Sequence, residues 1–250
     1  MDAQLLMKTA ALAGELMLCS GAETYRVEDT MHHILKTADN LEMAEVLVIM
    51  TGITATIKQK DKNVISIVKR VNSRSTNMSR IMEVNDISRR YCGEEITLEE
   101  AYKELSGLKK NIYSRLENRL GVLGICVGFS IFFGGGIREI LVTFLVGLVL
   151  TACMTIGEKM RFHAFLQDVF GSFGIAVSSL LLSSLVKINL DTVIISSIMP
   201  MVPGVAITNA VRDTLQGDYL SGSARVLEAF LKAAGIAVGI AIGLLLMGVA

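Results

Sequence analysis

The sequence contains few prolines and few of the motifs that mark soluble enzymes. Pro200 and Pro203 are the only prolines among 250 residues. There is no GxxxxGK-S/T phosphate-binding loop, no GxGxxG after a predicted strand and no Ser-His-Asp arrangement. These absences give no support for an enzyme or for a nucleotide-driven pump. We therefore expect no catalytic residue, no cofactor and no bound metal.

Net charge and cysteine spacing argue against two further classes. Lys plus Arg and Asp plus Glu both number 24, so the formal net charge is +0. Without a basic stripe and interleaved aromatic residues, the sequence gives no argument for a nucleic-acid partner. The four cysteines form no CxxC pair, and we interpret them as reduced packing residues rather than a disulfide frame or metal site. They are Cys19, Cys92, Cys126 and Cys153.

Hydrophobic residues are abundant but unevenly distributed. They make up 52% of the chain, and the mean hydropathy is +0.53. Residues 1–118 hold 16 of the 24 basic and 17 of the 24 acidic residues. We therefore expect a charged domain at residues 1–118, followed by an apolar domain at residues 119–250. Asp2 and Glu15 break the basic-then-apolar order of a signal peptide, so we do not interpret the amino terminus as one.

The first 118 residues predict a small α+β domain. Apolar residues at helical spacing predict helices at 3–20, 22–38 and 77–91. Thr97 and Glu100 form a capping-box signature that opens a further helix through Leu105. Residues 109–119 are expected to lead helically into the membrane. Three strands in an antiparallel meander, covered by the two leading helices, are predicted from branched residues at 46–50, 53–58 and 64–71.

Four side chains on one face of the second helix have a spacing that would also suit a metal. Glu28 and His32 are four residues apart, as are Asp29 and His33, so each pair can meet on the helix surface. A zinc site needs further ligands, and no cysteine or third ligand set lies nearby in the sequence. A solvated helix face is the simpler interpretation, and we assign no metal residue.

The apolar half predicts an integral membrane α-helical domain with five spans. Uncharged stretches, near the short end of the length that crosses a bilayer core, lie at residues 120–137, 140–157, 169–186, 192–211 and 233–250. Most Lys and Arg residues lie in loops that would share one side with the charged domain. We therefore expect a multi-pass protein of the plasma (inner) membrane, with a cytoplasmic amino terminus and the carboxy terminus outside.

Glycines recur every four positions in the first and last of these spans. Gly124 and Gly128 do so in the first span, and Gly235, Gly239 and Gly243 in the last. This spacing lets helix backbones approach closely. The sequence leaves two partners open, a helix of the same chain or a helix of another subunit.

The fourth predicted span is interrupted. Residues 192–211 read TVIISSIMPMVPGVAITNAV, with Pro200, Pro203 and Gly204 in the middle. Each proline removes a backbone donor, and carbonyls freed in a membrane need partners inside the protein or in a water-lined cavity. Broken helices of this kind commonly form substrate sites in secondary transporters. We interpret these three residues as part of a substrate site, with a proline-kinked packing helix as the alternative.

The residues after the break extend this candidate site. Thr208 and Arg212 are four positions apart, as are Asn209 and Asp213, so each pair lies near one helix face. Arg212 suits a substrate carboxylate, while Thr208 and Asn209 suit an ammonium or hydroxyl group. Asp213 and Asp218 are candidates for a coupling proton, since desolvation near a membrane cavity raises the pKa of a carboxylate. An interfacial ion pair is the alternative for Arg212 and Asp213.

Several stretches together resemble one known family. Residues 21–31, GAETYRVEDTM, resemble a signature near the start of the threonine/serine exporter family. So do residues 68–90, VKRVNSRSTNMSRIMEVNDISRR, and the helix ITLEEAYKEL at 96–105. The PxxPG sequence at 200–204 continues the match, which covers essentially the whole chain in order.

The resemblance implies an activity and partners that composition does not. It implies export of small amino acids such as threonine and serine, or of a dicarboxylate such as succinate in some paired members. The family pairs this unit with a second membrane unit, fused or separate, and this chain stops after its fifth predicted span. A separate partner subunit of the same family is therefore implied, and a homo-oligomer is a further expectation. Without nucleotide motifs we expect proton coupling; a membrane-anchored regulatory or binding protein is the alternative.

The topology can be tested by cysteine labelling. A single cysteine at residue 62 should react only with reagents on the cytoplasmic side, and one at residue 250 only from outside. The measurement is labelling in intact cells with a membrane-impermeant maleimide, before and after permeabilisation. Labelling of both positions from the same side would refute an odd number of spans.

Overall fold

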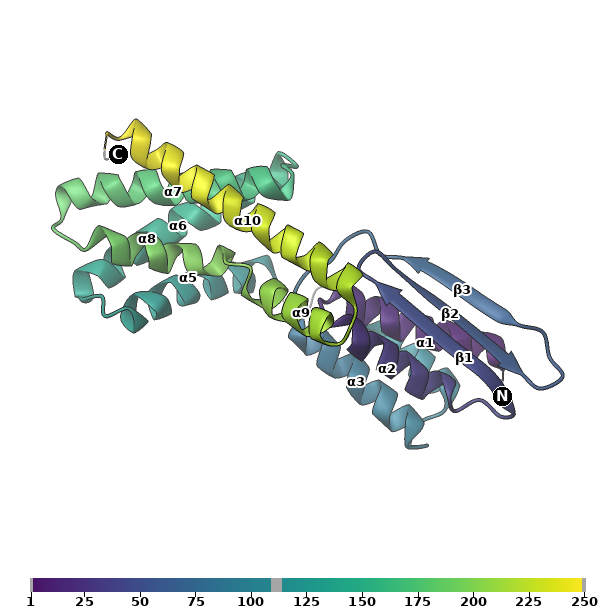
Figure 1. Cartoon of the computed structure of the whole chain (residues 1–250). Coiled ribbons are helices and arrows are strands. Elements are labelled where there is room, and N and C mark those ends of the chain that lie inside the picture. The colour runs from purple at the N-terminus through teal and green to yellow at the C-terminus, as the bar shows by residue number, and fades with distance from the viewer. Residues whose placement is uncertain (1, 109–113, 249–250) are drawn as a thin grey trace. The chain divides into compact units, whose positions relative to one another are not determined.

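The computed structural model describes residues 2–108 and 114–248. The chain divides into two compact units, one made of Met1–Ile112 with Val205–Val226, the other of Tyr113–Gly204 with Leu227–Ala250. Figure 1 shows the helices and strands of both units in chain order. The described part of the chain is mostly helical and contains one small sheet.

The sheet of the first unit is an antiparallel meander. It consists of β1 (Leu41–Ile49), β2 (Gly52–Gln59) and β3 (Ile65–Arg70), in the order β1-β2-β3 (Figure 1). The predicted meander is therefore confirmed. Strand β1 begins earlier than predicted because it pairs with β2 along its whole length, with an irregularity between Leu41 and Met43.

Four helices accompany this sheet. They are α1 (Ala3–Cys19), α2 (Thr24–Leu35), α3 (Met78–Cys92) and α4 (Leu98–Gly107). Asn77 caps α3 by accepting a hydrogen bond from the backbone of Arg80. Thr97 and Glu100 form the predicted capping box at the start of α4. The sequence therefore determines these two helix starts locally.

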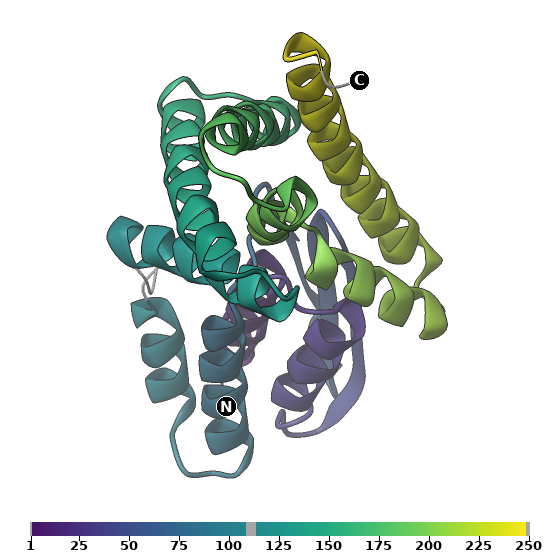
Figure 2. The ribbon, with the colours of Figure 1, turned by 90° about the vertical axis from the view of Figure 1, so that its left-hand side faces the viewer.

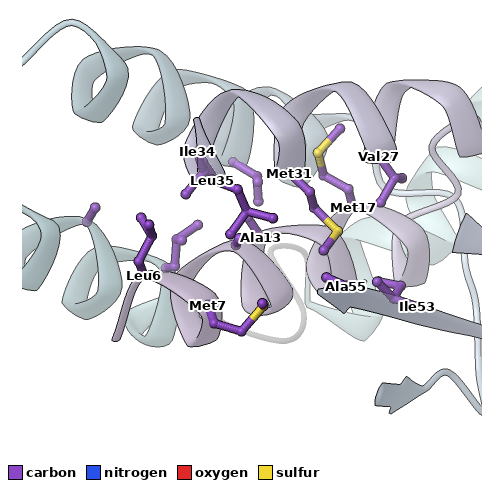
Figure 3. Packing of buried hydrophobic residues seen from close by; sticks show 14 of the residues in the cluster. Leu6, Met7, Ala13, Met17, Val27, Met31, Ile34, Leu35, Ile53 and Ala55 are labelled. Carbon is purple, nitrogen blue, oxygen red and sulfur yellow. The ribbon is translucent and has the colours of Figure 1, made fainter. Parts of the chain in front are cut away.

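The core of the first unit lies between the leading helices and the sheet. Along β2 every second residue is buried, including Ile53, Ala55 and Ile57. Figure 3 shows Met17 of α1 and Met31 of α2 in the same cluster as Ile53 and Ala55. Full burial of a side chain of this size contributes about 1.5–3 kcal/mol, so this cluster is a main source of the unit's stability.

The turn between α1 and α2 is tightly constrained. Gly21 has a φ of 83°, a left-handed conformation that glycine adopts without strain. Glu23 is extended, and α2 therefore begins at Thr24 rather than at residue 22 as predicted. The Ser75 N–H donates to the Cys19 carbonyl at 2.9 Å, which ties the turn to the segment before α3.

The second unit is a helical bundle. It contains α5 (Arg115–Phe132), α6 (Ile137–Lys159), α7 (Ala164–Leu185), α8 (Leu190–Ile198) and the later turns of α10 (Tyr219–Leu246). Helix α8 contacts α5, α6 and α7, and Figure 2 shows these four helices together. An apolar cluster lies between them, with Val146, Leu150 and Ile175 fully buried, and several serine and threonine side chains of these helices are buried as well.

Within the described residues, three helices are long and apolar enough to cross a membrane. They are α6, α7 and α10, and a fourth span arises if α8 with its short extension and α9 (Gly204–Leu215) count as one broken span. The first predicted span lies on α5, which carries three charged residues in its opening turns. These are Arg115, Glu117 and Arg119. The count of five spans stays a prediction.

Helix α5 does not continue from the preceding segment as predicted. Ser114 is extended and forms a capping box with Glu117, so the helix begins at Arg115. The earlier part of the predicted helix, residues 109–113, lies outside the described residues. Helix α10 in turn begins at Tyr219, well before the predicted fifth span, so charged residues such as Arg225 and Lys232 are helical.

The two sets of spaced glycines have different environments. A Cβ added to Gly239 of α10 would overlap the Ser172 Oγ and the Val169 carbonyl of α7. Gly243 likewise faces α7, where Ala176 is close. The α10 glycines therefore pack against a helix of the same chain. On α5, a Cβ at Gly124 would have nothing within 4 Å among the described residues.

This difference predicts opposite effects for one substitution. Gly239→Ala should destabilise the second unit by about 1–3 kcal/mol, because the methyl group overpacks the α7–α10 contact. Gly124→Ala, the matched control, should be neutral or stabilising by up to about 1 kcal/mol through helix propensity. Thermal unfolding of the purified protein in detergent measures both. Equal midpoints for the two variants would contradict the observed α7–α10 packing.

Candidate functional site

The helical structure is interrupted at the two prolines, and the fourth span itself stays a prediction. Helix α8 ends at Ile198, a 3-10 turn, η1 (Met199–Met201), follows, and Val202 is extended before α9 begins at Gly204. Pro200 lies in the 3-10 turn and is half-buried, and Pro203 is buried directly before α9. The two prolines therefore stop one helix and precede the next, as their missing N–H groups require.

The predicted site residues are divided between the two units. Pro200, Pro203 and Gly204 belong to the second unit. The remaining five belong to the first unit and are Thr208, Asn209, Arg212, Asp213 and Asp218. The side chains of Asn209, Arg212 and Asp213 contact the α1–α2 turn, and Asp218 caps the start of α10. Thr208 is exposed.

Asp213 is the centre of these contacts and is fully buried. Its Oδ1 accepts hydrogen bonds from the Thr24 backbone N–H at 3.2 Å and from the Thr24 hydroxyl at 2.9 Å. Its Oδ2 accepts from the Arg225 Nε at 2.8 Å. The Glu23 side chain makes no capping bond of its own at the start of α2. The Asp213 carboxylate therefore caps α2 from another helix, where a negative charge is favourable.

Two further side chains bind carbonyl groups of the same turn. Arg225, which is 4% exposed, donates from Nη2 to the Ala22 carbonyl at 2.7 Å. Asn209, also buried, donates from Nδ2 to the Gly21 carbonyl at 2.8 Å. Buried carbonyl groups need such partners, and this turn finds them on α9 and α10. We call this arrangement, defined by Gly21–Thr24, Asn209, Arg212, Asp213 and Arg225, the polar junction.

Arg212 completes the polar junction at its exposed edge. Its Nη1 donates to Glu23 Oε1 at 2.6 Å, while 55% of the Arg212 side chain is exposed. Burial alone would raise the pKa of Glu23. Hydrogen bonds from its own backbone and from Arg212 outweigh that effect and hold the pKa below its usual range. The alternative of an Arg212–Asp213 pair is wrong, since Arg212 pairs with Glu23 and Asp213 with Arg225.

Two more carboxylates lie close to the polar junction. Asp218 precedes α10 and accepts the Ser221 N–H at 3.1 Å, as a helix-capping residue does. Glu28 of α2 accepts the Val48 N–H at 2.8 Å, on the edge strand of the sheet. Burial raises the pKa of Glu28, and the nearby charges of Asp218 and Asp213 raise it further.

The spacing of carboxylates and histidines on α2 does not build a metal centre. Glu28 is bonded to Val48, and the His33 ring Nδ1 lies 2.8 Å from the Asp29 carbonyl oxygen. Across residues 2–108 and 114–248 there is no group of three or more His, Cys, Asp or Glu residues that could hold a metal ion.

Sequence reasoning missed three side chains that form the polar junction, those of Glu23, Thr24 and Arg225. Glu23 and Thr24 stand inside the stretch that carries the family resemblance, but spacing gave them no role. Arg225 was counted only among the loop Lys and Arg residues that predict the orientation in the membrane, and received no role in a site. The signal that could have found them is weak, because Thr24 and Asp213 are 189 positions apart.

The comparisons with known proteins agree on one family. Residues 8–247 match the family model of the threonine/serine exporters, ThrE. The chain is 24% identical over 233 residues to the "Probable threonine/serine exporter" of Mycobacterium tuberculosis, covering 92% of this chain and 44% of that protein. It is 25% identical over 250 residues to the "Threonine/serine exporter" of Corynebacterium glutamicum, covering 96% and 50%. The chain thus spans about half the length of these relatives, and no solved structure matches it.

The polar junction predicts a large stability effect for Asp213. Asp213→Leu should destabilise the first unit by about 3–5 kcal/mol, because it leaves the buried Arg225 guanidinium unpaired. Changing both residues, Asp213→Leu with Arg225→Met, should recover much of that loss. Asp61→Asn, an exposed turn residue, is the control, with an expected change within about 0.5 kcal/mol. Denaturant or thermal unfolding in detergent measures all three, and a stable single variant would contradict the role of the pair.

Proposed function

The chain belongs to the threonine/serine exporter family, and from this we propose that it is part of a secondary transporter that exports small amino acids such as threonine and serine. The names of both relatives, threonine/serine exporters, support this substrate class. A dicarboxylate such as succinate is the second candidate, since the partly exposed Arg212 guanidinium suits a carboxylate on either kind of substrate.

The break between α8 and α9 is the observation that carries the proposal. It lies between two apolar helices that only together have the length and composition of a membrane span. A helix that is interrupted inside a membrane needs partners for its freed backbone groups, and transporters commonly use such groups to bind substrate. Pro200, Pro203 and Gly204 are the residues of this break that we propose as part of the substrate site.

Arg212 is the proposed carboxylate-binding residue. One of its nitrogen atoms is bonded to Glu23, yet more than half of its side chain is exposed. Its other guanidinium N–H groups can therefore donate hydrogen bonds to a substrate carboxylate. Thr208, four positions earlier and exposed, is proposed to bind the ammonium or hydroxyl group. Asn209 is included in the proposal, although its amide already binds the Gly21 carbonyl.

Proton coupling is proposed for the carboxylates beside the polar junction. Asp213 and Asp218 both act electrostatically on Glu28, whose pKa lies above its ordinary value. Carboxylates that act on one another in this way do not ionise independently. We propose Asp213 and Asp218 as the coupling candidates and add Glu28, which spacing alone did not indicate.

The proposal includes a membrane topology and a second membrane unit. We propose five spans with α5 as the first, a cytoplasmic amino terminus and a location in the cell membrane. The apolar helices and the family support a membrane protein in general. The curated relatives are about twice as long as this chain. We propose that a second unit of the same family works with it, and a homo-oligomer is a further arrangement to test.

An export assay tests the activity. Cells are loaded with labelled threonine, serine or succinate, and efflux is followed with this chain alone and with a co-expressed candidate partner of the family. We expect efflux of threonine or serine that a protonophore abolishes. Efflux of succinate alone would select the dicarboxylate alternative. No efflux of any of the three, with both proteins present in the membrane, would contradict the proposal.

The role of Arg212 needs a variant pair, because the residue also holds Glu23. Arg212→Ala should reduce efflux at least about tenfold without lowering the amount of protein in the membrane, through loss of a charge-assisted carboxylate contact of about 1.5–3 kcal/mol. Glu23→Gln weakens the same structural contact but leaves the guanidinium intact, and should retain most efflux. If both variants lose efflux equally, Arg212 acts through the polar junction and not on the substrate.

A further inference from the structure

We propose that a groove between α2 and α3 binds a small solute through a carboxylate group, at a site separate from the α8–α9 break. The groove belongs wholly to the first unit. Its volume is about 320 Å³, within the size range of small-molecule pockets, and it is open to solvent on one side. This inference does not depend on the proposed transport activity.

The groove is built from matching faces of two helices. Each helix contributes residues at positions i, i+3, i+4 and i+7, the spacing of one helix face. Helix α2 contributes Arg26, Asp29, Thr30 and His33, and helix α3 contributes Asn85, Ser88, Arg89 and Cys92. The core-facing sides of both helices are apolar, with Val27 and Met31 on α2 and Val84 on α3 fully buried. A polar cavity at this helix contact is therefore not a continuation of the core.

The charged side chains of the groove leave a positive excess. Asp29 and His33 are one turn apart on α2, and 3.4 Å separates Asp29 Oδ1 from His33 Nδ1. Arg26 has only a long contact, since its Nη1 is 3.5 Å from Glu23 Oε2. Arg89 makes no ion pair with any residue that the structure describes, and its side chain is exposed. Two guanidinium groups beside one cavity suit a carboxylate, because their paired N–H groups match its two oxygens.

Neutral groups line the rest of the cavity. Thr30 Oγ1 and Asn85 Oδ1 are 3.4 Å apart, which is too long for a strong hydrogen bond and leaves both able to bind a ligand. Ser88 is buried at the same helix face. Together with Asp29, these groups can accept hydrogen bonds from an ammonium or hydroxyl group of the ligand. A hydroxylated amino acid and a dicarboxylate share the carboxylate that we infer, and the test below separates them.

The groove is connected to α9 through one side chain. Glu23 lies 3.5 Å from Arg26 through Oε2 and 2.6 Å from Arg212 through Oε1. A carboxylate bound to Arg26 would compete with Glu23 for that guanidinium. Because Glu23 is also the partner of Arg212, occupancy of the groove would change the polar junction. The site is therefore suited to a regulatory solute.

Cys92 provides a local measurement in the full-length protein. It lines the groove and is half-buried, and burial raises the pKa of its thiol, so modification is best followed at mildly alkaline pH. The protein in detergent is treated with N-ethylmaleimide, and the modification rate of each cysteine is read by peptide mass spectrometry. Cys19, also half-buried but outside the groove, is the internal reference.

We expect L-threonine or succinate to slow the modification of Cys92 and leave the Cys19 rate unchanged. At ten times the dissociation constant the Cys92 rate should fall about elevenfold. Protection by threonine alone would identify an amino acid as the ligand, and protection by succinate alone a dicarboxylate. Arg89→Gln should remove most of the protection, whereas Arg70→Gln, an exposed arginine on β3, should retain it.

Three results would overturn the inference. The first is that neither solute protects Cys92 from modification at millimolar concentration. The second is that the modification of Cys92 and Cys19 slows equally, which indicates general stabilisation. The third is that Cys92 of the Arg89→Gln variant is protected as well as Cys92 of the wild-type chain. The Cys92 rate of Arg89→Gln without ligand verifies that the groove is intact. Since no transport is measured, failure of this test leaves the proposed export activity unaffected, and the reverse also holds.

Discussion

The hydrogen bonds between the Asp213 carboxylate and the amino-terminal end of α2 are the interaction on which the first unit depends. The carboxylate is fully buried and would be costly without partners, yet Thr24 and Arg225 satisfy both of its oxygens. Its position at a helix amino terminus adds a favourable electrostatic contribution. The carboxylate joins parts of the chain that are 189 positions apart. A neutral side chain at this position would leave Arg225 as a buried, uncompensated cation.

This interaction explains why α9 belongs to the sheet-containing unit although it follows α8 directly along the chain. Its polar face, with Asn209 and Asp213, is buried against the α1–α2 turn. Ala210 is buried as well, whereas most of the remaining residues of α9, including Val211, are exposed. Helix α9 is therefore both the second half of a candidate broken span and a structural part of the sheet-containing unit. Arg212 belongs to both parts, because its guanidinium pairs with Glu23 while more than half of its side chain is exposed.

Much of the fold could be predicted from local sequence signals. The capping residues before α3 and α4, the meander and the break at Pro200 and Pro203 all follow from short-range chemistry. The start of α10 could not be predicted, because the hydropathy of residues 219–232 says nothing about the Asp218 cap. The contacts of the polar junction could not be predicted from the sequence either. Which buried charge meets which partner depends on tertiary packing, and one sequence carries no information on such distant pairs.

The path of the chain between the units bears on how the protein can be divided. A fragment that ends at the compositional boundary near residue 118 would lack Asn209, Asp213 and Arg225. The carbonyl and N–H groups of the α1–α2 turn would then lose their hydrogen-bond partners. Each such group that stayed buried would lower the free energy of unfolding by about 1–3 kcal/mol. Such a fragment is an incomplete fold rather than an independent domain. Its smallest complement is the helical segment 205–226, supplied in trans as a peptide or fused by circular permutation.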